Sequence, residues 1–513
     1  MTPEVIGAGL DFFYLLWLWV PGIVLSYRFG FRHPTDLLPI GFLLSTAVAS
    51  LVYSVTHALG LSALAVPTTR ALLLVSGLIA LATLMKSVLP IATAALWASA
   101  IALFGVFLRN ILRLDGWMQQ ADHWLTGWIT VVIQADLGSD IYADDAVVKK
   151  GIAFPVIYGL GRQGLYLAAV PTVVLILIVL ATYRLITTIL TSNSARSRAW
   201  IFAGVMALWL STSMFWGLST YQHGHGLVAL SVAVASRLVV STLPDVTESP
   251  ARRSQTRPPT TWMVAGGLFL STFVMAQSRI ESFALGMLLV LPFLWQKPAS
   301  KTWAVFAPRL VAILGGPIGF FVWFMSIDVA PVTFAPRAVI FAVVFGAAIS
   351  AAVIFFYRPS LGYLARWGIP LVFAGALVAY LLPIFSSRNQ LYFLQLNTFL
   401  GEGLWGYSWW FFLAAGIFLA SDRQKTPREN LVLWLGIVAI MFTILVKSID
   451  NFGQQGQGNI REGWSDSVNR TLFHSFGLVT AIGTVAISRT LRRFGLAQKG
   501  QPGNESVTTS TAL

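Results

Sequence analysis

The sequence predicts an all-α fold: a polytopic transmembrane helical bundle of about 13–15 spans with amphipathic helices in its outer loops. Composition is the first reason. Hydrophobic residues make up 56% of the 513 residues and charged residues only 11%, and the mean hydropathy is +0.74. Too few polar side chains remain to cover a water-soluble globule. The second reason is that apolar stretches near the length of a span, about 20 residues, recur along the chain.

The expected spans follow one another at short intervals. They cover residues 7–27, 38–59, 71–90, 92–112, 164–187, 199–218, 225–243, 261–277, 281–296, 303–325, 337–357, 367–385, 407–421, 431–447 and 471–488. The first is interpreted as a span rather than a signal peptide, because no basic segment precedes it and no small-residue cleavage site follows. Several stretches are short for a bilayer, so tilted or re-entrant segments are expected.

Loops and composition divide the chain into six regions. These are N-terminal spans (1–112), an outer acidic loop with an interfacial helix (113–155), central spans (156–243), a cytoplasmic linker (244–260), C-terminal spans (261–490) with outer loops 386–406 and 447–470, and a disordered cytoplasmic tail (491–513). The linker contains Pro, Ser and Arg in a pattern typical of flexible connections, and the tail is rich in small polar residues.

Charge predicts the orientation of these loops. When the chain is threaded with its N-terminus outside, most of the 34 Lys and Arg residues fall on the inner side and most of the 20 acids on the outer side. This asymmetry predicts that basic loops and the C-terminus are cytoplasmic. Anionic lipid headgroups therefore account for the net charge of +14, and no nucleic-acid partner is expected. The absence of cysteine excludes disulfides and thiolate metal sites.

The densest acidic cluster is Asp136, Asp140, Asp144 and Asp145 in the first outer loop. Four carboxylates so close in sequence repel one another unless a cation or a base joins them. A divalent cation such as Mg²⁺ or Mn²⁺ at Asp144 or Asp145 would clamp a phosphate, or one carboxylate would act as a general base on a sugar hydroxyl. A solvated loop that simply carries acids is the alternative.

A second constellation precedes the last span, in NIREGWSDSVNRTLFH. It contains Arg461, Glu462, Asp466, Arg470 and His474. If this segment is helical, Asp466, Arg470 and His474 share one face. Guanidinium and imidazole groups at the outer mouth of a helix would suit a lipid-linked phosphate. The alternative is a helix N-terminus capped by Ser465 or Asp466, with Arg470 reaching to lipid headgroups.

Two histidines, His223 and His225, fall on a short outer turn whose glycines favour no rigid metal geometry. Arg279 and Glu281 on the next outer turn are expected to form an ion pair at the rim of the bundle, and such a pair adds little to stability. Arg237 and Arg309 are expected to extend to the inner surface.

Aromatic residues gather near three outer loops. They are Trp405, Tyr407, Trp409 and Trp464, and in the first outer loop Trp117, Trp124 and Trp128. The first set would stack on sugar faces or form an aromatic belt at the membrane interface. The second set would occupy the lipid side of the interfacial helix.

Two segments resemble the GT-C class of integral-membrane glycosyltransferases. One is the outer acidic loop GSDIYADDAVVKKG, and the other is REGWSDSVNRTLFH, which is similar to a stretch in actinobacterial-like members. The resemblance implies a GT-C-like fold, a bacterial plasma membrane location and sugar transfer from a polyprenyl-phosphate donor on the extracytoplasmic side. GT-C enzymes usually carry their acidic motif after the first helix, whereas four expected spans precede it here.

Carried over residue by residue, the resemblance makes Asp144 or Asp145 the catalytic base or a metal ligand. Arg461, Arg470 and His474 become donor-phosphate ligands, and Asp136, Asp140, Glu462 and Asp466 remain candidates for binding metal or acceptor. The expected function is a glycosyltransferase acting on an envelope glycan, lipid or protein. The alternatives are a transporter or flippase for a lipid-linked or polar solute, and a non-catalytic scaffold for envelope synthesis.

Overall fold

The computed structural model describes residues 3–84, 89–112, 153, 156–157, 165–220, 224–243, 260–279, 282–296, 302–326, 396–449 and 470–495. Within these ranges the regular elements are helices and no β-strand occurs, so the all-α prediction is confirmed for the described residues. Most of residues 113–155, 244–260, 447–470 and 491–513 lie outside the description, and their predicted roles as loops, linker and tail stay predictions. Of the predicted outer loop 386–406, residues 396–406 are described, and they form a short helical segment followed by turns.

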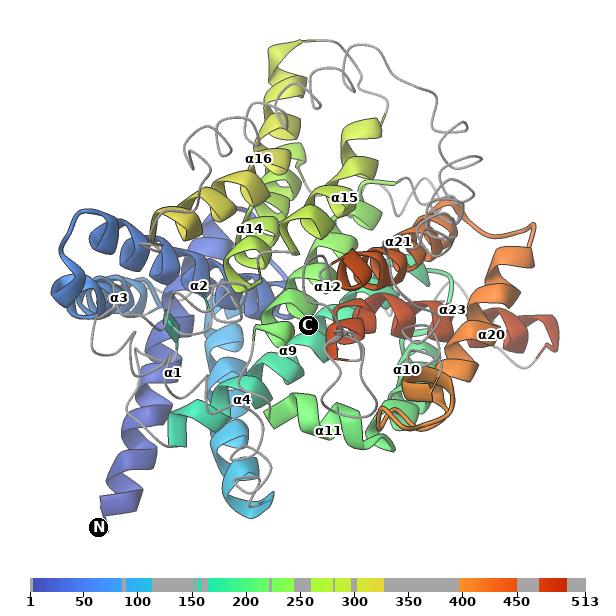
Figure 1. Ribbon diagram of the computed structural model, residues 1–513, viewed down its shortest axis with the longest axis horizontal. Coiled ribbons are helices and arrows are strands. Elements are labelled where there is room, and N and C mark those ends of the chain that lie inside the picture. The colour runs from blue at the N-terminus through green and yellow to red at the C-terminus, as the bar shows by residue number, and fades with distance from the viewer. Residues whose placement is uncertain are drawn as a thin grey trace, which may run out of the picture.

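The helices keep the labels of Figure 1. Those of the N-terminal half are α1 (Pro3–Arg28), α2 (Pro34–Ala58), α3 (Ser62–Leu84), α4 (Leu89–Leu112), α9 (Leu165–Ile189), α10 (Ala195–Leu210), α11 (Ser213–Thr220) and α12 (His225–Ser241). Those of the C-terminal half are α14 (Thr261–Ser278), α15 (Ser282–Trp295), α16 (Trp303–Ser326), α20 (Ser408–Ser421), α21 (Pro427–Ile449), the 3₁₀ turn η3 (Leu472–Ser475) and α23 (Phe476–Arg493).

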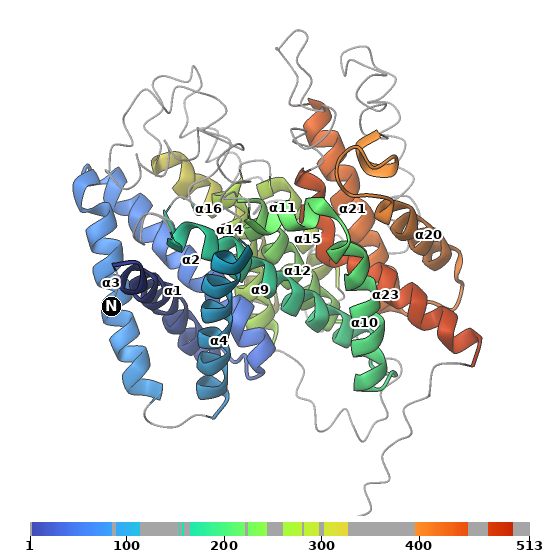
Figure 2. The ribbon, with the colours of Figure 1, turned by 90° about the horizontal axis from the view of Figure 1, so that it is seen from below.

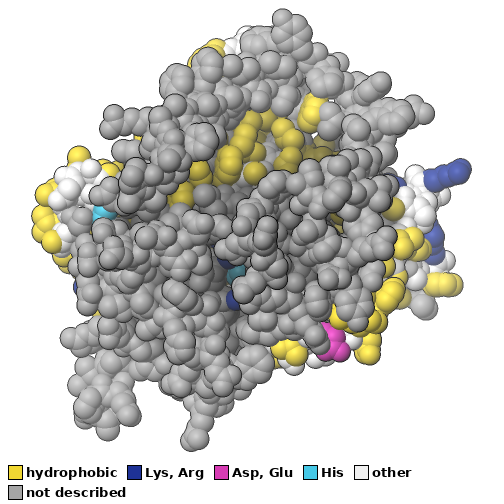
Figure 3. All heavy atoms as spheres, viewed as in Figure 1, with side chains coloured by type: hydrophobic (Ala, Val, Ile, Leu, Met, Phe, Trp, Pro, Cys, Tyr) yellow, Lys and Arg dark blue, Asp and Glu magenta, His cyan; other side chains and the backbone are white. Residues whose placement is uncertain are grey.

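Six helices of the described part are long and apolar enough to cross a membrane. The spanning segments lie in α2, α3, α4, α9, α16 and the combined η3 and α23. Shorter apolar segments occur in α1, α12, α15 and α20. In the view of Figure 3, the described side chains that reach the surface are largely hydrophobic. The chain is therefore a helical membrane protein, while the count of about 13–15 spans remains a prediction.

Helix α12 lies in the middle of the bundle (Figure 1 and Figure 2). Apart from Gly226 and Ser241, all of its residues are buried, and it contacts α2, α9, α14, α15, α21 and α23. A helix that is covered on every side requires small residues for close approach, and α12 supplies Ala229, Ala233 and Ala235. Its central position links two chemically different ends of the bundle.

We call these the histidine end and the arginine end. At the histidine end, His225 at the start of α12 lies beside Arg279 and His474. At the arginine end, about 18 Å away along the helix axis, Arg237 near the end of α12 pairs with Asp36. Arg428 joins the start of α21 to this end by donating to the carbonyl oxygens of Leu243 and Thr188.

The span expected over residues 199–218 is wrong in detail, because the structure divides it into α10 and α11. Hydroxyl groups end one helix and begin the next: Thr212 Oγ1 donates to the carbonyl of Trp209 and accepts from the backbone N–H of Phe215. Ser211 Oγ donates to the carbonyl of Leu208. These local hydrogen bonds compete with a continuous helix.

Candidate functional site

The histidine end is built by a close approach between the start of α12 and the end of α14. Gly224 precedes α12, and a Cβ atom there would lie 2.5 Å from the carbonyl oxygen of Ser278. Only glycine permits this contact without a shift of the backbone. It brings His225, the first residue of α12, beside Arg279, the extended C-cap residue of α14.

A hydrogen-bonded chain joins three residues from three segments. Arg279 Nη1 lies 3.2 Å from His225 Nε2, and His225 Nδ1 lies 2.9 Å from Nε2 of His474 in η3. A guanidinium is only a donor, so His225 Nε2 accepts and its Nδ1–H donates to His474.

All three side chains lie inside the protein. The exposed fraction is 2% for His225, 7% for Arg279 and 2% for His474. The two imidazole rings are 5.1 Å apart between centroids and tilted by 38°. Low local dielectric strengthens the electrostatic pull of a guanidinium on an anion, and imidazole N–H groups add directional donors. We call Arg279, His225 and His474 the Arg-His-His cluster.

Of the residues predicted to bind the donor phosphate, His474 belongs to this cluster. Arg470, half-buried, lies four residues before it. Arg461 lies outside the described residues. So do the other predicted site residues: Asp136, Asp140, Asp144, Asp145, Glu462 and Asp466, together with His223 and Glu281. Their predicted roles therefore stay predictions.

Two residues of the cluster were interpreted differently from the sequence. The sequence predicted Arg279 in a rim ion pair with Glu281, which lies outside the described residues, and His225 on a short outer turn. The structure buries both side chains and joins them to each other, a contact that the sequence did not predict. The only sequence signal for the contact is that three expected outer turns each carry a His or an Arg. Separations of 54 and 249 residues leave no periodicity that would reveal it.

Within the described ranges, no group of three or more His, Asp or Glu side chains is arranged to hold a metal ion. The acidic loop with Asp136 and Asp144 lies outside those ranges. A divalent cation therefore stays a prediction for that loop.

The arginine end holds a buried carboxylate shared by two arginines. Asp36 in the first turn of α2 pairs with Arg237 of α12 at 2.7 Å and with Arg184 of α9 at 3.3 Å. Arg237 was expected to extend to the inner surface, and the structure shows it buried and paired instead. Burial, with the nearby guanidinium groups of Arg184 and Arg237, lowers the pKa of His33, although Asp36 acts in the opposite direction.

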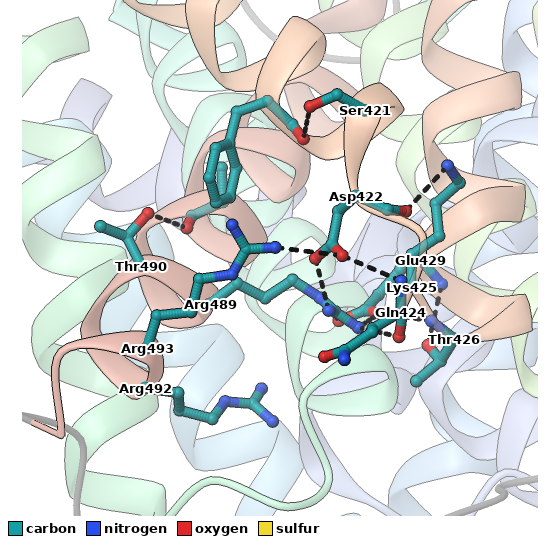
Figure 4. Close-up of polar contacts among 12 residues, drawn as sticks. Ser421, Asp422, Gln424, Lys425, Thr426, Glu429, Arg489, Thr490, Arg492 and Arg493 are labelled. Carbon is teal, nitrogen blue, oxygen red and sulfur yellow. Dashed lines mark hydrogen bonds and ion pairs between the residues drawn. The ribbon is translucent and has the colours of Figure 1, made fainter.

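A second network at this end joins α20, α21 and α23 (Figure 4). Arg489 donates to Asp422 at 2.6 Å and through Nε to Glu429 at 2.9 Å, while Arg493 contacts Asp422 at 3.1 Å. Burial acts to raise the pKa of Asp422, but the backbone N–H of Gln424 and the Arg489 guanidinium outweigh burial and lower it. The network therefore holds three helix ends together.

The aromatic residues near 405 are not an interfacial belt throughout. Trp405 is fully buried and Trp409 is 5% exposed, whereas Tyr407 is 71% exposed. Trp405 and Trp409 pack edge-on against Trp209 of α10, whose indole N–H donates to Thr480 of α23 at 2.9 Å. These two tryptophans form core between α10, α20 and α23, whereas Tyr407 is exposed. Trp464 lies outside the described residues.

In comparisons with protein-family models, with curated proteins and with solved structures, no match to this chain is found.

Proposed function

We propose that the chain is an integral-membrane glycosyltransferase that takes a sugar from a polyprenyl-phosphate donor and transfers it to an envelope glycan, lipid or protein. The supporting observation is the Arg-His-His cluster at one end of a bundle with membrane-spanning helices. The charge of the loops predicts that this end faces the extracytoplasmic side. A phosphate on a membrane-embedded chain would reach such an end without leaving the bilayer.

The cluster has the chemistry that a departing phosphate requires. Arg279 provides a guanidinium that matches phosphate oxygens in geometry and charge. The hydrogen bond between His225 and His474 holds the two imidazole rings in place beside this guanidinium. Arg470 and Arg461 would add positive charge from the same segment, as the sequence predicts.

The proposed reaction is an inverting displacement. A carboxylate, Asp144 or Asp145, takes the proton of the acceptor hydroxyl, and the oxygen attacks the anomeric carbon of the donor sugar. The bond from that carbon to the phosphate oxygen breaks, and its electron pair stays on the polyprenyl phosphate. The Arg-His-His cluster stabilises that charge as it develops, which lowers the barrier. Mg²⁺ or Mn²⁺ at the acidic loop would add to this stabilisation.

Binding of a polyprenyl phosphate and of the matching uncharged polyprenol to the purified protein in nanodiscs tests the proposal first. The phosphate is expected to bind more tightly. Arg279→Gln and His474→Ala should each weaken its binding about tenfold or more, since hydrogen bonds to charged groups contribute about 1.5–3 kcal/mol. His57→Gln is the matched control, because His57 lies at the other end of α2 from Asp36 and outside the cluster.

Equal binding of the phosphate and the alcohol, or equal losses in the His57 control, would contradict the assignment of the cluster. Sugar transfer is assayed next: activity that survives alanine at both Asp144 and Asp145 would rule out the carboxylate base. Translocation of the donor across the bilayer without transfer would instead support a flippase. Absence of binding, transfer and translocation would support a scaffold.

A further inference from the structure

A groove of about 320 Å³ lies between α1, α2 and α3, in the half of the bundle nearer the arginine end. Its lining includes Pro21, Leu25, Arg28, Ser45, Ser76 and Ile79. The groove follows α1 from Pro21 to Arg28, which is about 10 Å along a helix axis. That length is shorter than one leaflet of a bilayer, whose whole hydrocarbon core is about 30 Å thick.

The groove opens away from the protein core. Leu25 and Ile79 line it and are 42% and 63% exposed, although both are large apolar side chains. In a helical membrane protein such exposed apolar surface faces lipid tails rather than water. The groove is therefore exposed to the acyl chains of the surrounding lipids.

The walls of the groove are held by glycine contacts. A Cβ atom on Gly22 of α1 would overlap the carbonyl oxygen of Gly41 of α2, and one on Gly77 of α3 would lie 2.5 Å from Trp17 of α1. Close approach at these glycines, to the backbone of α2 in one case and to the Trp17 ring in the other, fixes the helices against one another. The shape of the groove is thus fixed by the packing of α1, α2 and α3 against one another.

Polar groups occur at two levels of the groove. Arg28 lies exposed in the last turn of α1, and Arg32 stacks over the Tyr27 ring at 3.9 Å in the loop that follows. Deeper in, Ser45 is 3% exposed and its hydroxyl has no hydrogen-bond partner among the described residues. An ester oxygen of a lipid would satisfy that hydroxyl, and a phosphate would meet Arg28.

We infer that this groove binds one acyl chain of an anionic phospholipid from the leaflet at the arginine end, with the lipid phosphate on Arg28. The charge of Arg28 selects an anionic headgroup, because a juxtamembrane basic side chain attracts such lipids. The limited length and volume select a single acyl chain over a long polyprenyl chain. The site lies at the opposite end from the Arg-His-His cluster and does not depend on the proposed function.

Native mass spectrometry of the full-length protein released from nanodiscs of equal phosphatidylglycerol and phosphatidylcholine tests this inference. The wild type is expected to retain phosphatidylglycerol preferentially. Arg28→Gln should reduce that preference about fivefold, the effect expected for one basic residue near an anionic surface. Ser76→Phe, which places a ring in the groove, should reduce retention of both lipids. Arg196→Gln removes an equal charge from an exposed position at the start of α10 and should leave the preference unchanged.

Equal effects of Arg28→Gln and Arg196→Gln would overturn the inference and indicate lipid held only by general surface charge. Stronger retention of an added polyprenyl phosphate than of phosphatidylglycerol, lost in Arg28→Gln, would overturn the assigned occupant. Thermal unfolding of each variant separates loss of the site from loss of the fold, and Arg28→Lys should restore the preference in a folded protein.

Discussion

Asp36 is a single carboxylate on which two arginines from different helices depend. Its side chain is 8% exposed, and those of Arg237 and Arg184 are 11% and 29% exposed. The net stability that such a buried pair adds is small, because desolvation offsets the attraction between the charges. Loss of one member alone is costly, since the remaining charge stays buried without its counter-ion.

We therefore expect Asp36→Asn to lower the free energy of unfolding by about 3 kcal/mol. Equilibrium unfolding in mixed micelles measures this difference. Adding Arg237→Met should recover part of the loss, because the uncompensated charge is removed as well. Glu402→Gln, at an exposed acid, should have no effect, and similar losses in Asp36→Asn and Glu402→Gln would contradict the argument.

At the scale of single residues, the sequence selected His474 as a phosphate ligand, and that role stays a prediction. The structure shows its partner, His225, which the sequence did not indicate. The contact between His225 and Arg279 was not predicted, because a His or an Arg is common on an exposed turn and needs no partner there. Only the packing of α12 against α14 and η3 brings them together.

Among the elements, α14 and α16 form a close helix pair that depends on two glycines. A Cβ on Gly315 would overlap the carbonyl oxygen of Phe269, and one on Gly319 would lie 2.6 Å from that of Phe273. The spacing of four residues places both glycines on one face of α16. The side-chain amide of Gln277 adds a hydrogen bond from α14 to the carbonyl of Gly319.

Gly319→Ala should therefore force α16 away from α14 and lower the free energy of unfolding by about 1–3 kcal/mol, as overpacking does elsewhere. Gly266→Ala is the matched control, because a Cβ at that exposed position of α14 meets no atom within 4 Å. It should leave the stability unchanged or raise it slightly. The thermal midpoint in one detergent compares the two, and equal midpoints would contradict the role of Gly319.

Hydropathy predicted most of the described helices but could not predict how they end or pair. The break between α10 and α11 depends on the hydroxyls of Ser211 and Thr212, which barely change the mean hydropathy of an apolar window. From the sequence alone, the glycines of α16 are compatible with a flexible break in the helix or with a face that packs closely on another helix. The structure shows the second, because these glycines contact α14.

For the whole molecule, the two ends of the bundle should face opposite sides of the membrane. Exposed Glu402 lies before α20 and exposed Arg423 follows it. The chain has no cysteine, so a single introduced cysteine reports its own position. A membrane-impermeant maleimide should label Glu402→Cys in intact cells and Arg423→Cys only after permeabilisation.

The cysteine-free parent controls for background labelling. Labelling of both positions from one side would contradict a membrane crossing by α20, and the reverse pattern would overturn the orientation that the loop charges predict. The sequence could predict orientation because it depends on summed charge. It could not predict which helix lies at the centre, because nearly every apolar segment is hydrophobic enough to be buried.

The two arginine-end networks share an order along the chain. Asp36 precedes Arg184 and Arg237, and Asp422 and Glu429 precede Arg489. Synthesis proceeds from the N-terminus, so each acid has entered the membrane before the helix that carries its arginine. An unpaired arginine within a membrane helix is costly, most of all near the bilayer centre. In both networks the acidic residue is synthesised before the arginine that pairs with it. The order of synthesis therefore favours correct pairing of the helices.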